Sequence, residues 1–178
     1  MAIVYAPSAS PKEVAARFRA MMQRASDLSA VLTNAAEDVK LLMLDSFEFG
    51  VSPDGTPWKP NAQSTIDRKK SSKPGINIGD LRMSVTASAT KNSLSFGTNK
   101  PYAGDVQFGS TRTGNLKHAS YKGGTKRDKG SAFTVKVEGR AFVPMLRDGN
   151  LMTQGAAKAL FDSITKSVML YITTGKIT

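Results

Sequence analysis

The sequence predicts an α+β fold in which N-terminal helices and a C-terminal helix pack on a small, mainly antiparallel β-sheet. Three observations lead to this prediction. A helical pattern without glycine or further proline runs from residue 12 to residue 49, short strand-like segments follow between residues 81 and 147, and a second helical pattern covers residues 153–174. Because helices and strands are segregated along the chain, an alternating parallel sheet is not expected.

The length of the chain fits one domain with a substantial core. It has 178 residues, of which 40% are hydrophobic and 22% charged, and a folded domain of this size buries roughly 70% of its extended surface. We expect a single domain over residues 1–178 with four parts. These are a helical part (11–49), a Pro- and Gly-rich connection (50–80), a sheet (81–147) with a long basic loop (109–132), and the last helix (153–174).

The first helix has a clear start signal. Ser10, Pro11 and Glu13 form a capping box with proline at the first helical position. After it, apolar or small residues recur at alternating spacings of four and three, from Val14 to Leu42. Polar residues at 26–29 indicate a break, so we predict a short helix followed by a longer one over about 27–49, both burying their apolar stripe against the sheet or a second helix.

The connection after Gly50 contains three prolines and the only tryptophan. We predict a structural turn built on Pro53, Gly55 and Trp58. Glycine permits a positive φ there, and the indole provides a large apolar area that can fix the turn to the fold. For Trp58 an intramolecular core position is favoured over an anchor for a partner protein.

The middle of the chain predicts several short elements. Residues 84–90 and 93–96 are expected to form a hairpin, and residues 101–108 begin as a helical turn. Apolar and polar residues alternate over 133–137, which indicates a strand with one buried face. Residues 109–130 are polar, Gly-rich and basic, and are predicted to be a long loop.

The positive charge is concentrated in the middle of the sequence. The net charge is +11 overall and +10 within residues 51–150. Six basic side chains fall in the predicted loop, namely Arg112, Lys117, Lys122, Lys126, Arg127 and Lys129. Such a cluster can contact the phosphates of a polyanion such as DNA, or it can simply be a solvated surface.

Few residues suit catalysis or cofactor binding. The chain has no cysteine and one histidine, His118, which lies in the Lys-rich loop without a nearby carboxylate to orient it. No phosphate-binding glycine motif is present. We therefore expect no catalytic, cofactor-binding or metal-binding residues and no enzyme activity. A remote alternative is an enzyme that uses His118. No secretory signal or run of about 20 apolar residues indicates a membrane.

Five short motifs occur in a distinctive order. They are residues 53–60 (PDGTPWKP) after Phe49, 79–85 (GDLRMSV), 96–99 (FGTN), 101–109 (PYAGDVQFG) and 139–144 (GRAFVP). This order resembles the phage virion morphogenesis family, the tail-completion or neck proteins of tailed bacteriophages. The resemblance runs from about residue 12 to about residue 171. This sequence departs from the family pattern at Val106, where histidine is frequent, and at Ala141, where proline is usual.

The resemblance implies a structural virion protein that completes the tail and joins it to the head. It further implies a homo-oligomeric ring, of six copies, in the neck or at the head-proximal end of the tail, assembled in the host cytoplasm. The implied partners are the tail tube, neck or connector proteins and transiting genomic DNA, with no membrane. The alternative is a cytoplasmic DNA-binding protein that uses its basic loops without sequence specificity.

Two sets of residues are candidates for contacts in such a ring. The six basic loop residues would line the DNA channel or bind an acidic face of the adjoining ring component. The candidates for a subunit interface are Tyr102, Gln107, Phe108, Arg140 and Phe142. The aromatic residues and Gln107 suit packing inside the subunit equally well, and Arg140 suits either a buried ion pair or an interface rim.

Overall fold

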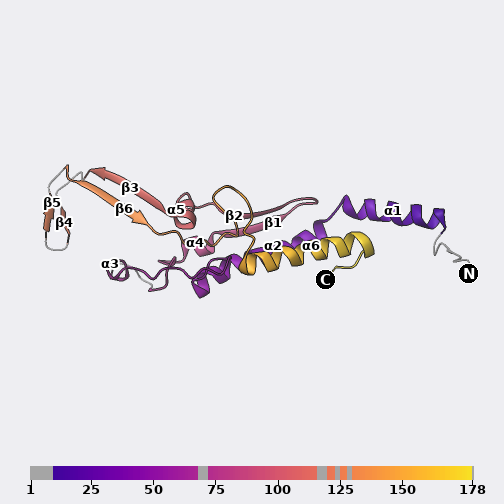
Figure 1. Cartoon of the computed structure of the whole chain (residues 1–178), viewed down its shortest axis with the longest axis horizontal. Coiled ribbons are helices and arrows are strands. Elements are labelled where there is room, and N and C mark those ends of the chain that lie inside the picture. The colour runs from indigo at the N-terminus through magenta and orange to yellow at the C-terminus, as the bar shows by residue number, and fades with distance from the viewer. Residues whose placement is uncertain (1–9, 68–71, 116–119, 123–124, 128–129, 178) are drawn as a thin grey trace, which may run out of the picture.

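The chain folds into an elongated body with an arm at each end, as seen in a computed structural model that describes residues 10–67, 72–115, 120–122, 125–127 and 130–177. Helix α1 (Pro11–Ala25) projects from one end, and the strands β3 to β6 project from the other (Figure 1). Between them, α2 (Ser29–Phe49) and α6 (Gly155–Thr174) form the body together with a β-hairpin. Three shorter helices are α3 (Gln63–Ile66), α4 (Asp80–Met83) and α5 (Ala103–Phe108).

The α+β class is confirmed, but the expected single sheet is wrong for the described residues. They contain three separate two-stranded antiparallel sheets: β1 (Val85–Ala89) with β2 (Leu94–Thr98), β3 (Ser110–Asn115) with β6 (Ala132–Val137), and β4 (Ser120–Lys122) with β5 (Thr125–Arg127). Helix α5 and the positive φ of Gly109 (70°) redirect the chain between β2 and β3. The first hairpin and the second therefore do not share an edge.

The prediction of a loop over residues 109–132 is also corrected. Residues 110–115 form β3 and pair with β6 in register from Ser110 opposite Val137 to Asn115 opposite Ala132. Most side chains of these two strands are exposed. β3 was missed because Ser110 to Asn115 include no apolar side chain and so show no alternation. β6 has the alternation, but its expected buried face is wrong, since Val135 is 49% exposed.

The predicted start of α1 and the predicted end of α2 are confirmed. The Ser10 hydroxyl accepts a hydrogen bond from the Glu13 amide (3.3 Å), and the Glu13 carboxylate accepts one from the Ser10 amide (2.7 Å). At the break, the Asp27 carboxylate accepts the Ser29 amide (3.0 Å) and the Ser29 hydroxyl (2.6 Å), and α2 starts directly after this turn. Gly50 ends α2 in the left-handed conformation, as a helix-terminating glycine does.

The core lies where α2, the Pro-rich turn and residues 142–143 meet. Phe47 and Phe142 are almost fully buried, with ring centroids 4.9 Å apart, and Phe47 meets the Trp58 ring edge-on at 5.5 Å. The Trp58 indole N–H donates to the Ser52 hydroxyl (3.1 Å) and to the Ala141 carbonyl (3.0 Å). The indole therefore ties the turn to a segment 83 residues further along the chain.

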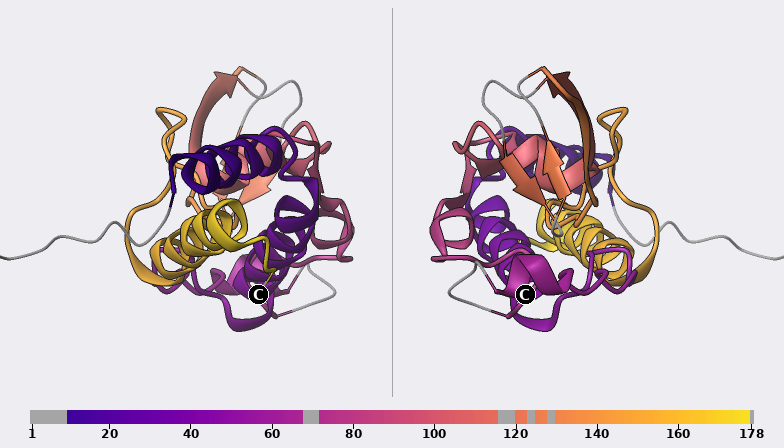
Figure 2. Two further views of the ribbon diagram at one scale, coloured as in Figure 1. Left: turned by 90° about the vertical axis from the view of Figure 1, so that its right-hand side faces the viewer. Right: turned by 90° about the vertical axis from the view of Figure 1, so that its left-hand side faces the viewer.

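The turn formed by Pro53, Gly55 and Trp58 is structural, and it also positions the start of α6. The Pro53 carbonyl accepts the Ala157 amide (2.9 Å). A Cβ on Gly155 would lie 2.3 Å from the Asp54 carbonyl carbon, so only glycine allows this close approach. From there α6 runs back along α2 and lies beside both α1 and α2 in the end views (Figure 2).

Helix α1 differs from the expectation. The same apolar spacing that buries Leu32 and Val39 of α2 leaves Val14, Phe18 and Met22 exposed by 41%, 60% and 72%. No residue of α1 is buried against the described part of the chain. Only the end of α1 is attached to the body, where the Arg24 guanidinium donates to the Ile172 carbonyl (2.6 Å).

This difference between the two helices makes a stability prediction. Leu32→Asp buries an unpaired charge, so it should cost roughly 3–5 kcal/mol and leave the chain unfolded or insoluble. Phe18→Asp, on the same sequence stripe, should leave the melting temperature of the isolated subunit unchanged. Circular dichroism melts of both variants measure this. Equal destabilisation by the two substitutions would contradict the exposed position of α1.

Candidate assembly surfaces

The first candidate surface is the basic arm formed by β3 to β6. It projects from the body as a long hairpin with β4 and β5 at its tip (Figure 1). Phe133 packs over Gly114 of the opposite strand, since a Cβ on Gly114 would lie 3.2 Å from the Phe133 ring. Lys122, Lys126 and Arg127 belong to β4 and β5. Lys117, His118 and Lys129 lie outside the described residues.

The base of the arm is held by polar contacts to α5 and to residue 147. Arg112 of β3 forms an ion pair with Asp105 of α5. The Arg147 guanidinium donates to the carbonyls of Phe108 (3.3 Å) and Gly109 (3.2 Å), and it lies 5.5 Å from the centroid of the Phe108 ring. Arg112 is therefore placed at the base of the arm, while its side chain stays 64% exposed.

Two backbone segments come into close contact at this base, each at a glycine. A Cβ on Gly109 would lie 2.8 Å from the Gly139 nitrogen, and a Cβ on Gly139 would lie 3.0 Å from the Phe108 carbonyl carbon. This close contact lets the arm leave the body beside an open groove of about 760 Å³, lined by α5, the start of β3, the end of β6 and Arg147. The glycines thus fix where the arm begins.

Arg140 lies between the arm and the Pro-rich turn. Its guanidinium donates to the Lys59 carbonyl (3.2 Å) and to the Asn61 side-chain oxygen (3.3 Å), and Arg140 Nε is buried with no hydrogen bond in the described part of the chain. Burial lowers the pKa of Arg140, and the nearby Glu138 carboxylate opposes that shift. Glu138 itself has a lowered pKa, chiefly through its hydrogen bond from Lys59.

Gln107 packs inside the subunit, which is the second of the two roles that the sequence left open for it. It is 6% exposed, and its side chain makes four hydrogen bonds with the backbone of residues 142–145. The amide nitrogen donates to the carbonyls of Val143 (2.8 Å) and Met145 (3.1 Å), while the oxygen accepts the amides of Phe142 (2.9 Å) and Val143 (3.0 Å). Gln107 thus satisfies a buried backbone segment that forms no sheet.

Of the other aromatic interface candidates, one is buried inside the subunit and two are partly exposed. Phe142 has no exposed surface and belongs to the core. Tyr102 and Phe108 are exposed by 43% and 39%, so an interface role for them stays a prediction. Sequence reasoning missed the surface of α1, because an apolar stripe at helical spacing looks the same whether its partner lies in the same chain or in another.

Comparison with known proteins identifies the family. The phage virion morphogenesis family matches residues 9–159, so the chain belongs to this family and takes part in building the phage virion. No match was found among curated proteins or among solved structures. In the described ranges, no helix has the length and apolar character needed to cross a membrane.

The contacts of Gln107 make a second stability prediction. Gln107→Leu leaves the amides of Phe142 and Val143 and the Met145 carbonyl without partners, while the Val143 carbonyl still accepts the Met145 amide (2.7 Å). This loss should lower the free energy of unfolding by roughly 2–4 kcal/mol. The matched control is Gln63→Leu, an exposed glutamine whose loss should change stability by less than about 0.5 kcal/mol. Urea unfolding of the three proteins measures the difference. If Gln107→Leu were as stable as the control, these hydrogen bonds would not hold the segment.

Proposed function

We propose that the protein is a non-enzymatic structural subunit that forms a closed ring at the head-proximal end of the tail, completes the tail and joins it to the head. The observation that carries this proposal is that α1 buries none of its residues against the described part of its own chain. A 15-residue helix with an exposed apolar row is not stable alone in water. A neighbouring subunit can provide the surface that this helix lacks.

The shape of the subunit supports a ring. The body carries one arm at each end, so each subunit can reach beyond its own boundary in two directions (Figure 1). Contacts between different surfaces of identical subunits close into a ring when the rotation between neighbours divides a full turn. The family resemblance implies six copies for this ring.

The basic arm gives the proposal an electrostatic part. A duplex passing through the ring carries one negative charge per roughly 1.7 Å of its axis, and repeated Lys and Arg side chains attract it without reading its sequence. We propose that Arg112, Lys117, Lys122, Lys126, Arg127 and Lys129 either line this channel or bind an acidic face of the adjoining ring component. Lysine binds a phosphate as a point charge and fixes no register on the duplex, which allows the genome to slide.

The experiment that tests this role locates the protein in purified particles. Mass spectrometry should find it in virions at a small fixed copy number, and labelled electron microscopy should place it at the junction of tail and head. The free protein should give the mass of a ring by native mass spectrometry. Absence from virions, together with tight DNA binding by a monomer, would instead support the DNA-binding alternative.

A variant of the arm tests the electrostatic part separately. Replacing Lys122, Lys126, Arg127 and Lys129 by glutamine removes four charges and should leave the melting temperature unchanged. Tail joining or DNA passage should be impaired, which is measured as a loss of infectious titre in a complementation assay. Normal titre from the quadruple variant would show that the charges only solubilise the arm.

A further inference from the structure

We infer that α1 of one subunit docks on the acidic outer face of α2 in a second copy of this chain. This inference rests on the proposed ring and names its interface. The outer face of α2 consists of the exposed residues Glu37, Asp38, Leu41, Asp45, Glu48 and Phe49. We refer to these six residues as the α2 face.

The first half of the interface is the exposed side of α1. Val14, Phe18 and Met22 follow one another at spacings of four and form a single apolar row. Arg17 and Arg19 flank this row on its two sides, and both are exposed. Neither arginine has an ion pair or hydrogen bond within the described ranges. The row and its flanks therefore present apolar area bordered by positive charge.

The second half is the α2 face, which has the complementary chemistry. Leu41 and Phe49 are exposed by 55% and 73%, which is unusual for large apolar side chains on a helix that otherwise packs in the core. Glu37, Asp38 and Asp45 surround them without an ion pair or hydrogen bond to the rest of the described chain. Glu48 differs from them, because it is paired with Lys73 (2.6 Å) and Arg82 (3.5 Å) of its own chain. The negative border of the apolar area on the α2 face therefore comes from Glu37, Asp38 and Asp45.

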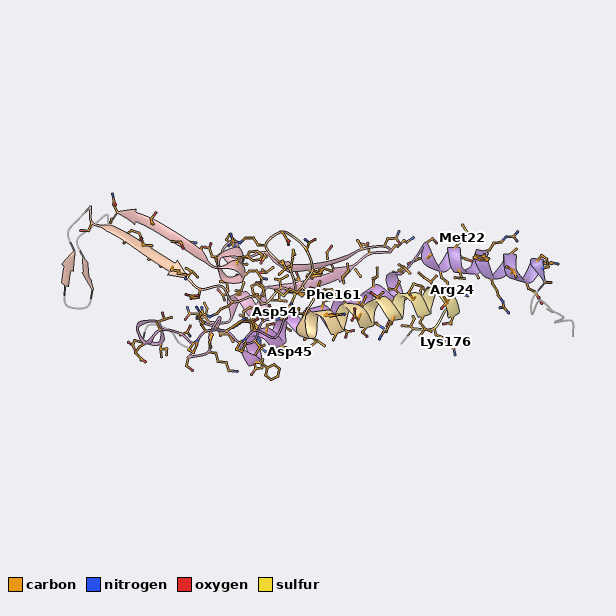
Figure 3. All side chains as sticks on the ribbon, in the orientation of Figure 1. Met22, Arg24, Asp45, Asp54, Phe161 and Lys176 are labelled. Carbon is orange, nitrogen blue, oxygen red and sulfur yellow. The ribbon has the colours of Figure 1, made fainter. Side chains whose placement is uncertain are left out.

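A groove beside the α2 face can receive a large side chain of α1. It has a volume of about 200 Å³ and is lined by α2 and the Pro-rich turn, with Asp45 and Phe49 at one side and Ala156 of α6 at the other. Asp45 lies on the outer side of α2 (Figure 3). An apolar side chain entering this groove would bring a flanking arginine of α1 close to the Asp45 carboxylate.

The α1 and α2 surfaces do not meet within one subunit. The Leu28 amide donates to the Lys91 carbonyl (2.8 Å), and Arg24 is bonded to the Ile172 carbonyl, so the link between the helices is fixed at both sides. Met22 and Arg24 point to opposite sides of α1, and the helix extends away from the body (Figure 3). Its apolar row is therefore directed away from α2 of the same chain.

The lengths of the two surfaces also agree. At 1.5 Å per residue, the 15 residues of α1 span about 22 Å and residues 37–49 of the α2 face about 20 Å. A contact between α1 and α2 of different copies joins two unlike surfaces, so every subunit donates one helix and receives another. Such a head-to-tail contact is the kind that closes into a ring.

Charge reversal tests this inference. Arg17→Glu with Arg19→Glu, and separately Glu37→Lys with Asp45→Lys, should each raise the concentration needed for half assembly by about tenfold or more. A chain carrying all four substitutions restores opposite charges across the contact and should assemble within about threefold of the natural chain. Lys166→Glu, an exposed charge of α6 on neither surface, is the matched control. Analytical ultracentrifugation over a concentration series measures the assembly, and circular dichroism checks that each variant is folded.

The outcomes separate this inference from the proposed function. Assembly unaffected by either pair of reversals, loss with only one pair, or failure of the fourfold variant to recover would each overturn the α1–α2 contact. A natural chain that remains monomeric at all concentrations would overturn this contact and the proposed ring together. None of these results removes the protein from the tail-to-head junction, which the localisation in virions tests independently.

Discussion

The architecture of this subunit depends on one buried contact, in which the Trp58 indole joins the end of α2 to residues 141–143. The indole packs on Phe47 and donates its N–H to Ser52 and Ala141, so a single side chain satisfies both apolar and polar requirements. The glycine at position 75 lies against the same ring, since a Cβ there would be 2.7 Å from it. Three segments far apart in the sequence are thereby held together without a continuous sheet.

This compact centre explains how the ends of the molecule can be so extended. The Gln107 side chain attaches α5 to the backbone of residues 142–145, and the Pro53 carbonyl attaches α6 through the Ala157 amide. Neither arm is therefore needed to complete the core. The arms are then available for contacts with other chains. In the ring that we propose, the exposed apolar surface of α1 is covered by a neighbouring subunit.

The sequence predicted those elements whose ends are set by capping, helix-terminating or turn residues. The capping box at Ser10, the stop at Gly50 and the hairpin around residues 91–92 were predicted because each depends on residues close in sequence. Strand β3 was not predicted, because its residues include no apolar side chain and so show no alternation. The partner of α1 was not predictable either. The spacing of its apolar residues shows that the helix has an apolar face, but not which chain covers that face. For Gln107 the sequence left both an interface and packing inside the subunit open, because the backbone groups that satisfy its side chain lie 35 to 38 residues further along the chain.

The central claim is that α1 becomes protected only when subunits associate, and hydrogen–deuterium exchange measures this most directly. Amides of α1 should exchange rapidly in the dilute subunit and slowly in the assembled protein, because the helix is buried only in the assembly. Amides around Val39 and Met43 of α2 should be protected in both states, since their side chains have no exposed surface. Slow exchange of α1 in the dilute subunit, or rapid exchange of α1 in the assembled protein, would contradict the account.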